Sequence, residues 1–311
     1  MILLSMFFQG LVLLLLAPLA TGCVRFCKAR LQGRKGASPF LPYVRFATLL
    51  RKEMVIPATA SWVFHTAPFI VVSTSAFAAF VLPLLSGGSA WGLDNFIVVA
   101  AILALGSVFL ILGGLDPGTA FGGMGASREM TLAALVEPAM ITVFAGFAAA
   151  SGHSDIGGML SAGGGALARH PALVLSLAAL CLVALAENAR YPVDNPATHL
   201  ELTMVHEAMI LEYSGAYLAL LEFASWLRLS VFAVLIANFV MPFPLIDASF
   251  SLSSMISAAA AATVKLIAVM LLLSLLESSI PKMRFYRMQE YLSTAFFIAI
   301  AGLVLTVLPI A

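Results

Sequence analysis

Long apolar runs, separated by short polar segments, make up most of this sequence. They cover residues 2–22, 63–86, 95–114, 131–150, 171–187, 215–240, 254–276 and 291–310. Most are near the roughly 20 residues that an α-helix needs to cross the hydrocarbon core of a membrane, and the fifth is the shortest. The pattern predicts an all-α integral membrane protein with about eight transmembrane helices.

The first apolar run, 2–22, has the hydrophobic character of a secretory signal peptide. Its positive charges follow the run instead of preceding it, and further apolar runs come after it. We therefore expect this run to be retained as the first helix.

Composition agrees with a membrane protein. Hydrophobic residues form 62% of the chain and charged residues only 10%, whereas a soluble domain carries about a quarter charged residues. So few charges cannot cover a surface that faces water. No polar stretch is long enough for a separate soluble domain, so we expect a single membrane domain over 1–311. The net charge of +1 gives no indication of a nucleic-acid partner.

Basic residues divide unevenly between the segments that connect the runs. Segments 23–62, 115–130, 188–214 and 277–290 carry thirteen of them: Arg25, Lys28, Arg30, Arg34, Lys35, Arg45, Arg51, Lys52, Arg128, Arg190, Lys282, Arg284 and Arg287. The alternate segments carry only Arg169. Because basic loops stay in the cytoplasm, these four segments are predicted to be cytoplasmic. With an even number of crossings, both termini are then expected on the non-cytoplasmic side.

The third of these loops is unusually acidic. The loop and the helix end before it hold five of the 15 acidic residues of the chain: Glu187, Asp194, Glu201, Glu207 and Glu212. Prolines interrupt helix near its start, and a helical pattern over 198–213 places Glu201 and Glu212 on one face. The segment is either a solvated amphipathic helix or a partly buried cluster that exchanges protons near neutral pH. Its apolar residues favour burial.

The sequence predicts no catalytic or metal site in this chain. The pair His206-Glu207 has no second histidine at helical spacing, so the zinc-protease pattern fails. The three cysteines, Cys23, Cys27 and Cys181, cannot supply the four ligands that an iron–sulfur cluster usually takes. Any redox cofactor is therefore expected on partner chains.

Four charged residues lie inside the apolar runs, where charge is costly and usually functional. They are Glu137, Glu222, Arg228 and Lys265. Glu222 and Arg228 are six residues apart, which is too far round a helix for easy pairing, so each is expected to have a partner on another helix. Glu137 precedes Pro138, which is expected to disrupt the local backbone. The alternative role is an ion pair that only locks two helices together.

Two further loop segments have distinctive compositions. The basic stretch Arg45–Met54 is typical of an anchor on anionic lipid, and it equally suits a docking surface for a soluble subunit. The glycine-rich stretch Gly114–Met130 matches no phosphate-binding motif and predicts close backbone packing against another segment. Within it, Ser127 is positioned to cap the helix that follows.

Several of these stretches together resemble one known family. Gly125-Ala-Ser-Arg-Glu-Met130, followed by Glu137-Pro138, is similar to a segment of the complex I subunit 1 family. The stretch from Glu187 to Asp194, with Glu201 and Glu212-Tyr-Ser-Gly215, resembles the glutamate-rich loop of that family. These motifs most resemble those of the membrane-anchor subunit of formate hydrogenlyases and of hydrogenase-4-type (group 4) energy-converting [NiFe] hydrogenases.

The resemblance implies a membrane anchor that docks a soluble arm and couples electron transfer to proton or sodium translocation. The implied partners are hydrogenase-like large and small subunits, an iron–sulfur protein and antiporter-like membrane subunits. Iron–sulfur clusters, and a [NiFe] centre where present, would belong to those partners. A quinone is not expected here, because energy-converting hydrogenases reduce protons. The implied location is the cytoplasmic (inner) membrane of a bacterium or archaeon.

The resemblance also implies roles for individual residues. Candidates for proton or ion coupling are Glu129, Glu137, Glu187, Asp194, Glu201, Glu207 and Glu212. To these the charges inside the apolar runs add Glu222 and Lys265. Candidates for the docking face are Arg25, Arg34 and Arg128.

Two other functions compete with this interpretation. A self-sufficient secondary transporter predicts inverted repeats and helices broken at mid-membrane, and neither is visible in the sequence. A purely structural anchor predicts that the acidic residues take no part in coupling.

Overall fold

A computed structural model of the protein contains α-helices and no strand in the regions that it describes. These regions are residues 2–83, 92–162, 170–194, 204–241, 252–280 and 285–308. The helices, in chain order, are α1 (Ile2–Leu31), α2 (Leu41–Leu50), α3 (Trp62–Val81), α4 (Phe96–Leu115), α5 (Ala120–Ser151), α6 (Ile156–Ala162), α8 (Leu173–Glu187), α9 (His206–Met209), α10 (Gly215–Val240), α11 (Leu252–Ser279) and α12 (Phe285–Val307). The predicted all-α class is confirmed.

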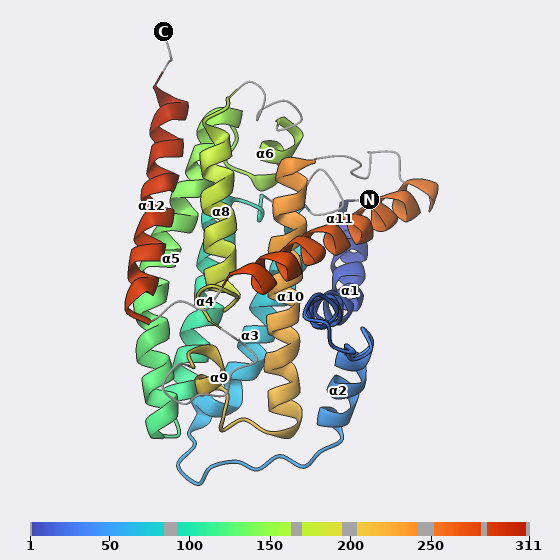
Figure 1. Ribbon diagram of the computed structural model, residues 1–311, viewed down its shortest axis with the longest axis vertical. Coiled ribbons are helices and arrows are strands. Elements are labelled where there is room, and N and C mark those ends of the chain that lie inside the picture. The colour runs from blue at the N-terminus through green and yellow to red at the C-terminus, as the bar shows by residue number, and fades with distance from the viewer. Residues whose placement is uncertain are drawn as a thin grey trace.

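Seven of these helices are long and apolar enough to cross a membrane: α1, α3, α4, α5, α10, α11 and α12. The fifth predicted segment forms α8, which has only 15 residues. At about 1.5 Å per residue it rises roughly 22 Å, less than the roughly 30 Å of the hydrocarbon core. It still packs against both α5 and α12 as a member of the same bundle (Figure 1). The chain is therefore a multi-pass membrane protein; in the described regions seven helices are long enough to span, and the shorter α8 belongs to the same bundle.

The central helix of the bundle is α10. In its most apolar window 72% of the residues are buried, against 28% for α11 and 22% for α12. It packs against α3, α1 and α11, while α4 joins α3 to the group formed by α5, α8 and α12 (Figure 1). Charged side chains of α10 therefore project into protein on most sides, where they need partners.

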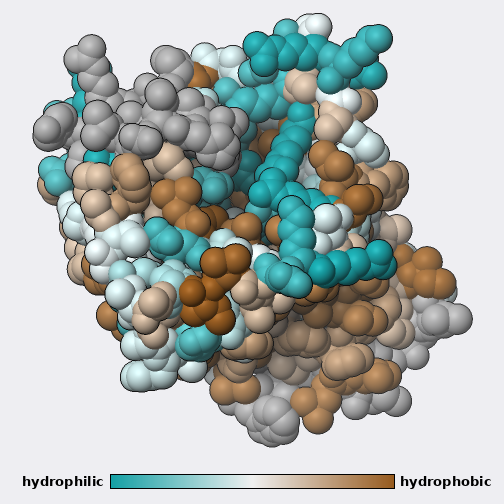
Figure 2. All heavy atoms as spheres, turned by 90° about the horizontal axis from the view of Figure 1, so that it is seen from below, coloured by the Kyte–Doolittle hydropathy of each residue, from teal (hydrophilic) through white to brown (hydrophobic). Residues whose placement is uncertain are grey.

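Parts of three of the four loops predicted to be cytoplasmic gather at one end of the bundle. The connections after α2 and α4, together with the region around α9, lie at the lower end in Figure 1. Seen from that end in Figure 2, hydrophilic side chains gather across the surface and hydrophobic ones border them. Four basic residues of the first of these loops are exposed: Arg34, Lys35, Arg51 and Lys52. The side of the membrane that this end faces stays a prediction.

Two sequence-based helix boundaries and two predictions about residues within α5 are wrong. Helix α1 runs past residue 22 to Leu31, so part of the first predicted loop is helical. Helix α5 begins at Ala120 instead of residue 131; Thr119 caps it by accepting a hydrogen bond from Gly122 N, and Ser127 lies inside the helix. Pro138 also lies inside α5, which continues across it. Helix–helix packing in lipid re-satisfies the backbone that proline and glycine would otherwise disrupt.

Small residues allow α5, α8 and α12 to approach closely. A Cβ atom on Gly146 of α5 would lie 2.8 Å from Ser176 Oγ of α8, and one on Gly302 of α12 would lie 2.5 Å from the same oxygen. Close approach at small residues is a main source of helix association in lipid. These two glycines therefore fix the position of the short helix α8.

Replacing Gly302 with valine should destabilise the bundle by about 1–3 kcal/mol, because the added side chain overlaps Ser176. The neighbouring exposed residue gives a matched control, Ala301→Val, which adds a side chain of the same final size toward the outside. Thermal unfolding in mild detergent compares the two. Equal midpoints would contradict the close contact.

Candidate functional site

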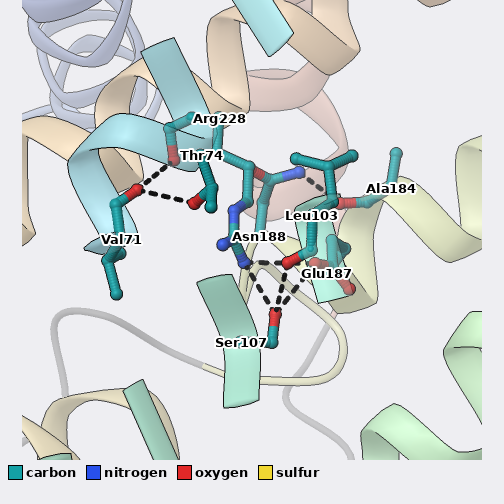
Figure 3. Close-up of polar contacts among 9 residues, drawn as sticks. Val71, Thr74, Leu103, Ser107, Ala184, Glu187, Asn188 and Arg228 are labelled. Carbon is teal, nitrogen blue, oxygen red and sulfur yellow. Dashed lines mark hydrogen bonds and ion pairs between the residues drawn. The ribbon is translucent and has the colours of Figure 1, made fainter. Parts of the chain in front are cut away.

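A buried ion pair joins the lower end of α8 to the middle of α10. Arg228 Nη1 lies 3.1 Å from Glu187 Oε1 and donates to Ser107 Oγ of α4 at 3.2 Å (Figure 3). Arg228 is only 7% exposed. Arg228 was predicted to need a partner on another helix, and it has one in Glu187 at the end of α8. The two charges and the Ser107 hydroxyl connect three helices.

A glycine makes room for this pair. A Cβ atom on Gly106 would lie 3.0 Å from Arg228 Nη2 and 2.5 Å from Thr74 Oγ1. Any larger residue at this position would press on the guanidinium. The absence of a side chain on α4 therefore lets the arginine lie between α4 and α8.

Two further acids from α5 surround the pair. Glu187 interacts electrostatically with Glu137, and Glu129 interacts with Glu187 and Arg228. Three predicted coupling residues are thus brought together around one cation. Several carboxyl groups near a single positive charge can hold and pass on protons.

A second buried cluster forms around Glu277, in the last turn of α11. Its carboxylate lies 3.1 Å from Lys28 Nζ of α1 and 3.5 Å from Arg190 Nη1. Lys28 also lies over the ring of Tyr191, 4.3 Å from its centre. Glu277 is 5% exposed and Arg190 is 8% exposed. The acid-rich segment after α8 is thereby tied to α1 and α11.

Glu222 pairs with Arg45 of α2, as the requirement for a partner outside α10 predicted. Arg25 of α1 lies within electrostatic reach of Glu222, Arg45 and Glu207. This group lies between α1, α2 and α10, near the start of α10. It places one predicted docking residue, Arg25, beside two predicted coupling residues.

The glycine-rich stretch packs against the acidic loop, which confirms the close packing predicted for it. A Cβ on Gly114 would lie 3.0 Å from Met209 Cβ, and one on Gly125 would lie 2.9 Å from Ala208 Cβ. Arg128 Nη1 donates to Met204 O at 2.9 Å. The loop is therefore seated directly on α4 and α5, and Arg128 holds it there.

The acidic loop is less helical than predicted. In its described part only α9 is helical, and Glu212 lies in the turn before α10. Asp194 is 3% exposed and accepts a hydrogen bond from Val205 N at 3.3 Å. Burial of this carboxylate favours the partly buried cluster over a solvated amphipathic helix. Glu201 lies outside the described residues.

Two predicted residues are not part of these clusters. Lys265 Nζ donates to Asn238 Oδ1 at 2.8 Å and to Met241 O at 2.6 Å, at the far end of α10 from the acidic loop. It thus caps the C-terminus of α10, where a positive charge is favourable. Arg34 is exposed in the turn after α1.

Sequence reasoning did not select Ser107, Lys28, Arg190 or Glu277 as site residues. Ser107 lies in an apolar run and carries no charge that marks it. Glu277 lies in the last turn of α11, and Arg190 lies just after α8. The one feature that could have marked them as site residues is their position at the predicted cytoplasmic boundary. Only the packing of α1, α8 and α11 shows that they meet.

His206 is the titratable residue of α9. Burial lowers its pKa to about 4; the positive charge of Arg228 adds to this, the carboxylate of Asp194 opposes it, and Arg190 lowers the pKa further. The imidazole is therefore neutral at physiological pH. A neutral imidazole both donates and accepts a hydrogen bond.

Replacing His206 with glutamine should make the folded protein less sensitive to acid. The unfolded chain takes up a proton near a pKa of about 6.5, whereas the folded chain does so only near about 4. Acid therefore favours unfolding between these values, by up to about 1.4 kcal/mol per pH unit from this residue. Thermal unfolding at several pH values measures the effect. The same pH dependence in wild type and His206→Gln would contradict the burial of a neutral histidine.

Comparison with known proteins identifies relatives along nearly the whole chain. A model of the NADH dehydrogenase family matches residues 3–307. Hydrogenase-4 component C of Escherichia coli (strain K12) is 31% identical over 278 residues, which cover 89% of this chain and 87% of that protein. Formate hydrogenlyase subunit 4 of the same organism is 29% identical over 278 residues and is covered to 89%, as is this chain.

A solved structure has the same fold. A chain of the membrane-bound sulfane sulfur reductase, an archaeal respiratory membrane complex, superposes with a TM-score of 0.80 at 18% identity. The match covers 97% of this chain and 99% of that one. Together with the family match over residues 3–307, these likenesses show that the chain belongs to the NADH dehydrogenase family.

Proposed function

We propose that this protein is the membrane subunit of a multisubunit oxidoreductase related to complex I. In this role it anchors an electron-transfer arm at the end formed by its basic and acidic loops. It also couples redox events at that arm to the movement of protons or sodium ions.

One observation carries the proposal: the acidic loop and the buried charges of the bundle form neighbouring, interacting groups. Glu129 interacts with Asp194 of the loop and with Glu187 and Arg228 of the bundle. Arg190 of the loop reaches Glu277 of α11. A charge change at the loop end can therefore be felt electrostatically by groups inside the membrane.

The relatives support the kind of complex. Two are a hydrogenase-4 component and a formate hydrogenlyase subunit, and a protein of the same fold belongs to a respiratory membrane complex. The partners we propose are hydrogenase-like large and small subunits, an iron–sulfur protein and antiporter-like membrane subunits. The redox cofactors would reside on the hydrogenase-like subunits and the iron–sulfur protein. The proposed location is the cytoplasmic membrane of a bacterium or archaeon.

Copurification tests the partners. The tagged protein is extracted in mild detergent, and the chains that accompany it are identified together with their nickel and iron content. Iron–sulfur and antiporter-like subunits with nickel would support a hydrogenase, and the same subunits without nickel a related complex with other redox chemistry. Recovery of this chain alone, in a form that transports a solute after reconstitution, would overturn the proposal.

The ion pair offers a sharper test of coupling. Glu187→Gln leaves Arg228 without its counter-charge, and breaking a buried pair costs about 3–5 kcal/mol, so this variant alone can fail to assemble. The double variant Glu187→Gln, Arg228→Gln keeps the site neutral and should assemble. Without the ionisable carboxyl, ion translocation per electron should fall by roughly a hundredfold, while electron transfer in the soluble arm continues.

The measurement is ion uptake into vesicles that contain the complex, alongside redox activity with artificial electron carriers. A matched control is Glu290→Gln, which removes an exposed acid of α12 that is not among the predicted coupling residues. Normal translocation by an assembled double variant would favour the purely structural anchor.

A further inference from the structure

We propose that a small cavity beside the ion pair binds a single water molecule, which joins Arg228 to Asn188 and to α9. The site lies where α3, α4, α8 and α10 meet the acidic loop. The existence of this water follows from the cavity and its polar atoms. Its consequence for coupling rests on the proposed function.

The cavity has the volume of one water site. It measures about 20 Å³, and its polar lining comes from Glu187, Asn188, His206, Ser225 and Arg228. An internal water needs roughly 10–15 Å³ and two or more polar partners. The rest of the lining includes the apolar residues Leu110 and Leu221. Both requirements are met, and the apolar walls leave the polar atoms as the contacts that fix the water.

A donor and an acceptor in this lining have no hydrogen-bond partner among the described residues. They are Arg228 Nη2 and Asn188 Oδ1, both fully buried. The neighbouring nitrogen of each side chain is already used, since Arg228 Nη1 binds Glu187 and Asn188 Nδ2 donates to Ala184 O at 2.8 Å. Figure 3 shows Asn188 and Arg228 side by side next to Glu187. A water accepts from the guanidinium and donates to the amide oxygen, which satisfies both.

The charges of the site favour water over an ion. The two charged residues that line the cavity, Arg228 and Glu187, neutralise one another at 3.1 Å, and neither Glu129 nor Glu137 lines it. A further cation would be repelled by the guanidinium, and a further anion by the carboxylate. His206 adds a neutral ring at the cavity wall. A neutral molecule that is both donor and acceptor therefore fits this set of groups.

In the proposed function the water has a definite place. It connects the intramembrane pair with His206 of the acidic loop, which the protein side chains alone leave separated by the cavity. Imidazole and water both donate and accept, so they can extend a hydrogen-bonded path. The loop and the ion pair are then linked by hydrogen bonds as well as by electrostatic interaction.

Radiolytic footprinting of the intact complex in mild detergent tests for the water. Radiation converts bound water to hydroxyl radicals, which modify the side chains beside it even where bulk solvent has no access. Leu110 and Leu221 line the cavity and are 3% and 2% exposed, whereas Leu180 and Leu227 are 0% exposed and lie elsewhere in the core. We expect Leu110 and Leu221 to be modified several-fold faster than these two controls. Equal, background-level modification of all four leucines would overturn the proposal.

A cavity-filling variant gives a second readout. Ala224 lines the cavity and is 1% exposed, so Ala224→Val places methyl groups where the water lies. Ala219→Val, a buried alanine of the same helix that does not line the cavity, is the matched control. Modification of Leu110 and Leu221 should fall to background in the first variant and persist in the second. Persistence in both would contradict a water at this site.

The wild-type comparison needs no variant to fold, so the water site stays testable if either valine variant fails to assemble. It also separates the two proposals. Unmodified cavity leucines would remove the water and leave ion coupling to its own test with the Glu187 and Arg228 variants. Modified leucines in a complex that does not translocate ions would keep the water and remove the proposed function.

Discussion

An arginine in the interior of a membrane bundle has to find its counter-charge on another helix, because lipid offers no water to solvate it. Here Arg228 takes that charge from the last residue of α8 and a hydroxyl from α4. The pair explains why a helix too short to span the membrane is still fixed in place, with its lower end held by charge and its flank by glycine contacts. It also brings the start of the acidic loop to α10, and the remaining acids gather around it.

The acidic loop keeps its place through backbone contact with glycine as much as through charge. Met209 and Ala208 lie directly over Gly114 and Gly125, where any side chain would push them away. Gly114 and Gly125 belong to the lower parts of α4 and α5. The acids of the loop therefore lie close to the acids of α5. Glycine thus does for the loop what Gly106 does for the arginine: it lets groups approach closely enough to interact.

Hydropathy predicts the helices well, because lipid requires long apolar runs with internally satisfied backbones. It predicts which charges need partners, as Glu222 and Arg228 show, and it cannot say which partners, because those depend on packing. Ser107 and Glu277 were missed as site residues for this reason. The early start of α5 was missed because glycine normally weakens helices, whereas here Gly125 packs against the loop and Gly122 packs against Gly114. Glu129 was selected through the family resemblance. Only the structure shows that it lies near Glu187, Asp194 and Arg228.

The position where α8 ends has an electrical consequence. Helix α8 ends at Glu187, well above the lower ends of α5 and α10, and α9 of the acidic loop lies below it (Figure 1). The electric field is weaker in polar protein than in hydrocarbon, because polar groups screen it. Most of the voltage across the bilayer therefore falls over the remaining apolar thickness. A charge that moves between the loop and Arg228 crosses only part of the potential, which is worth about 2.3 kcal/mol per elementary charge per 100 mV for the full distance. Exchange at this end therefore depends less on membrane voltage than a full crossing would, and the rest of the voltage acts on the steps that lie beyond the arginine.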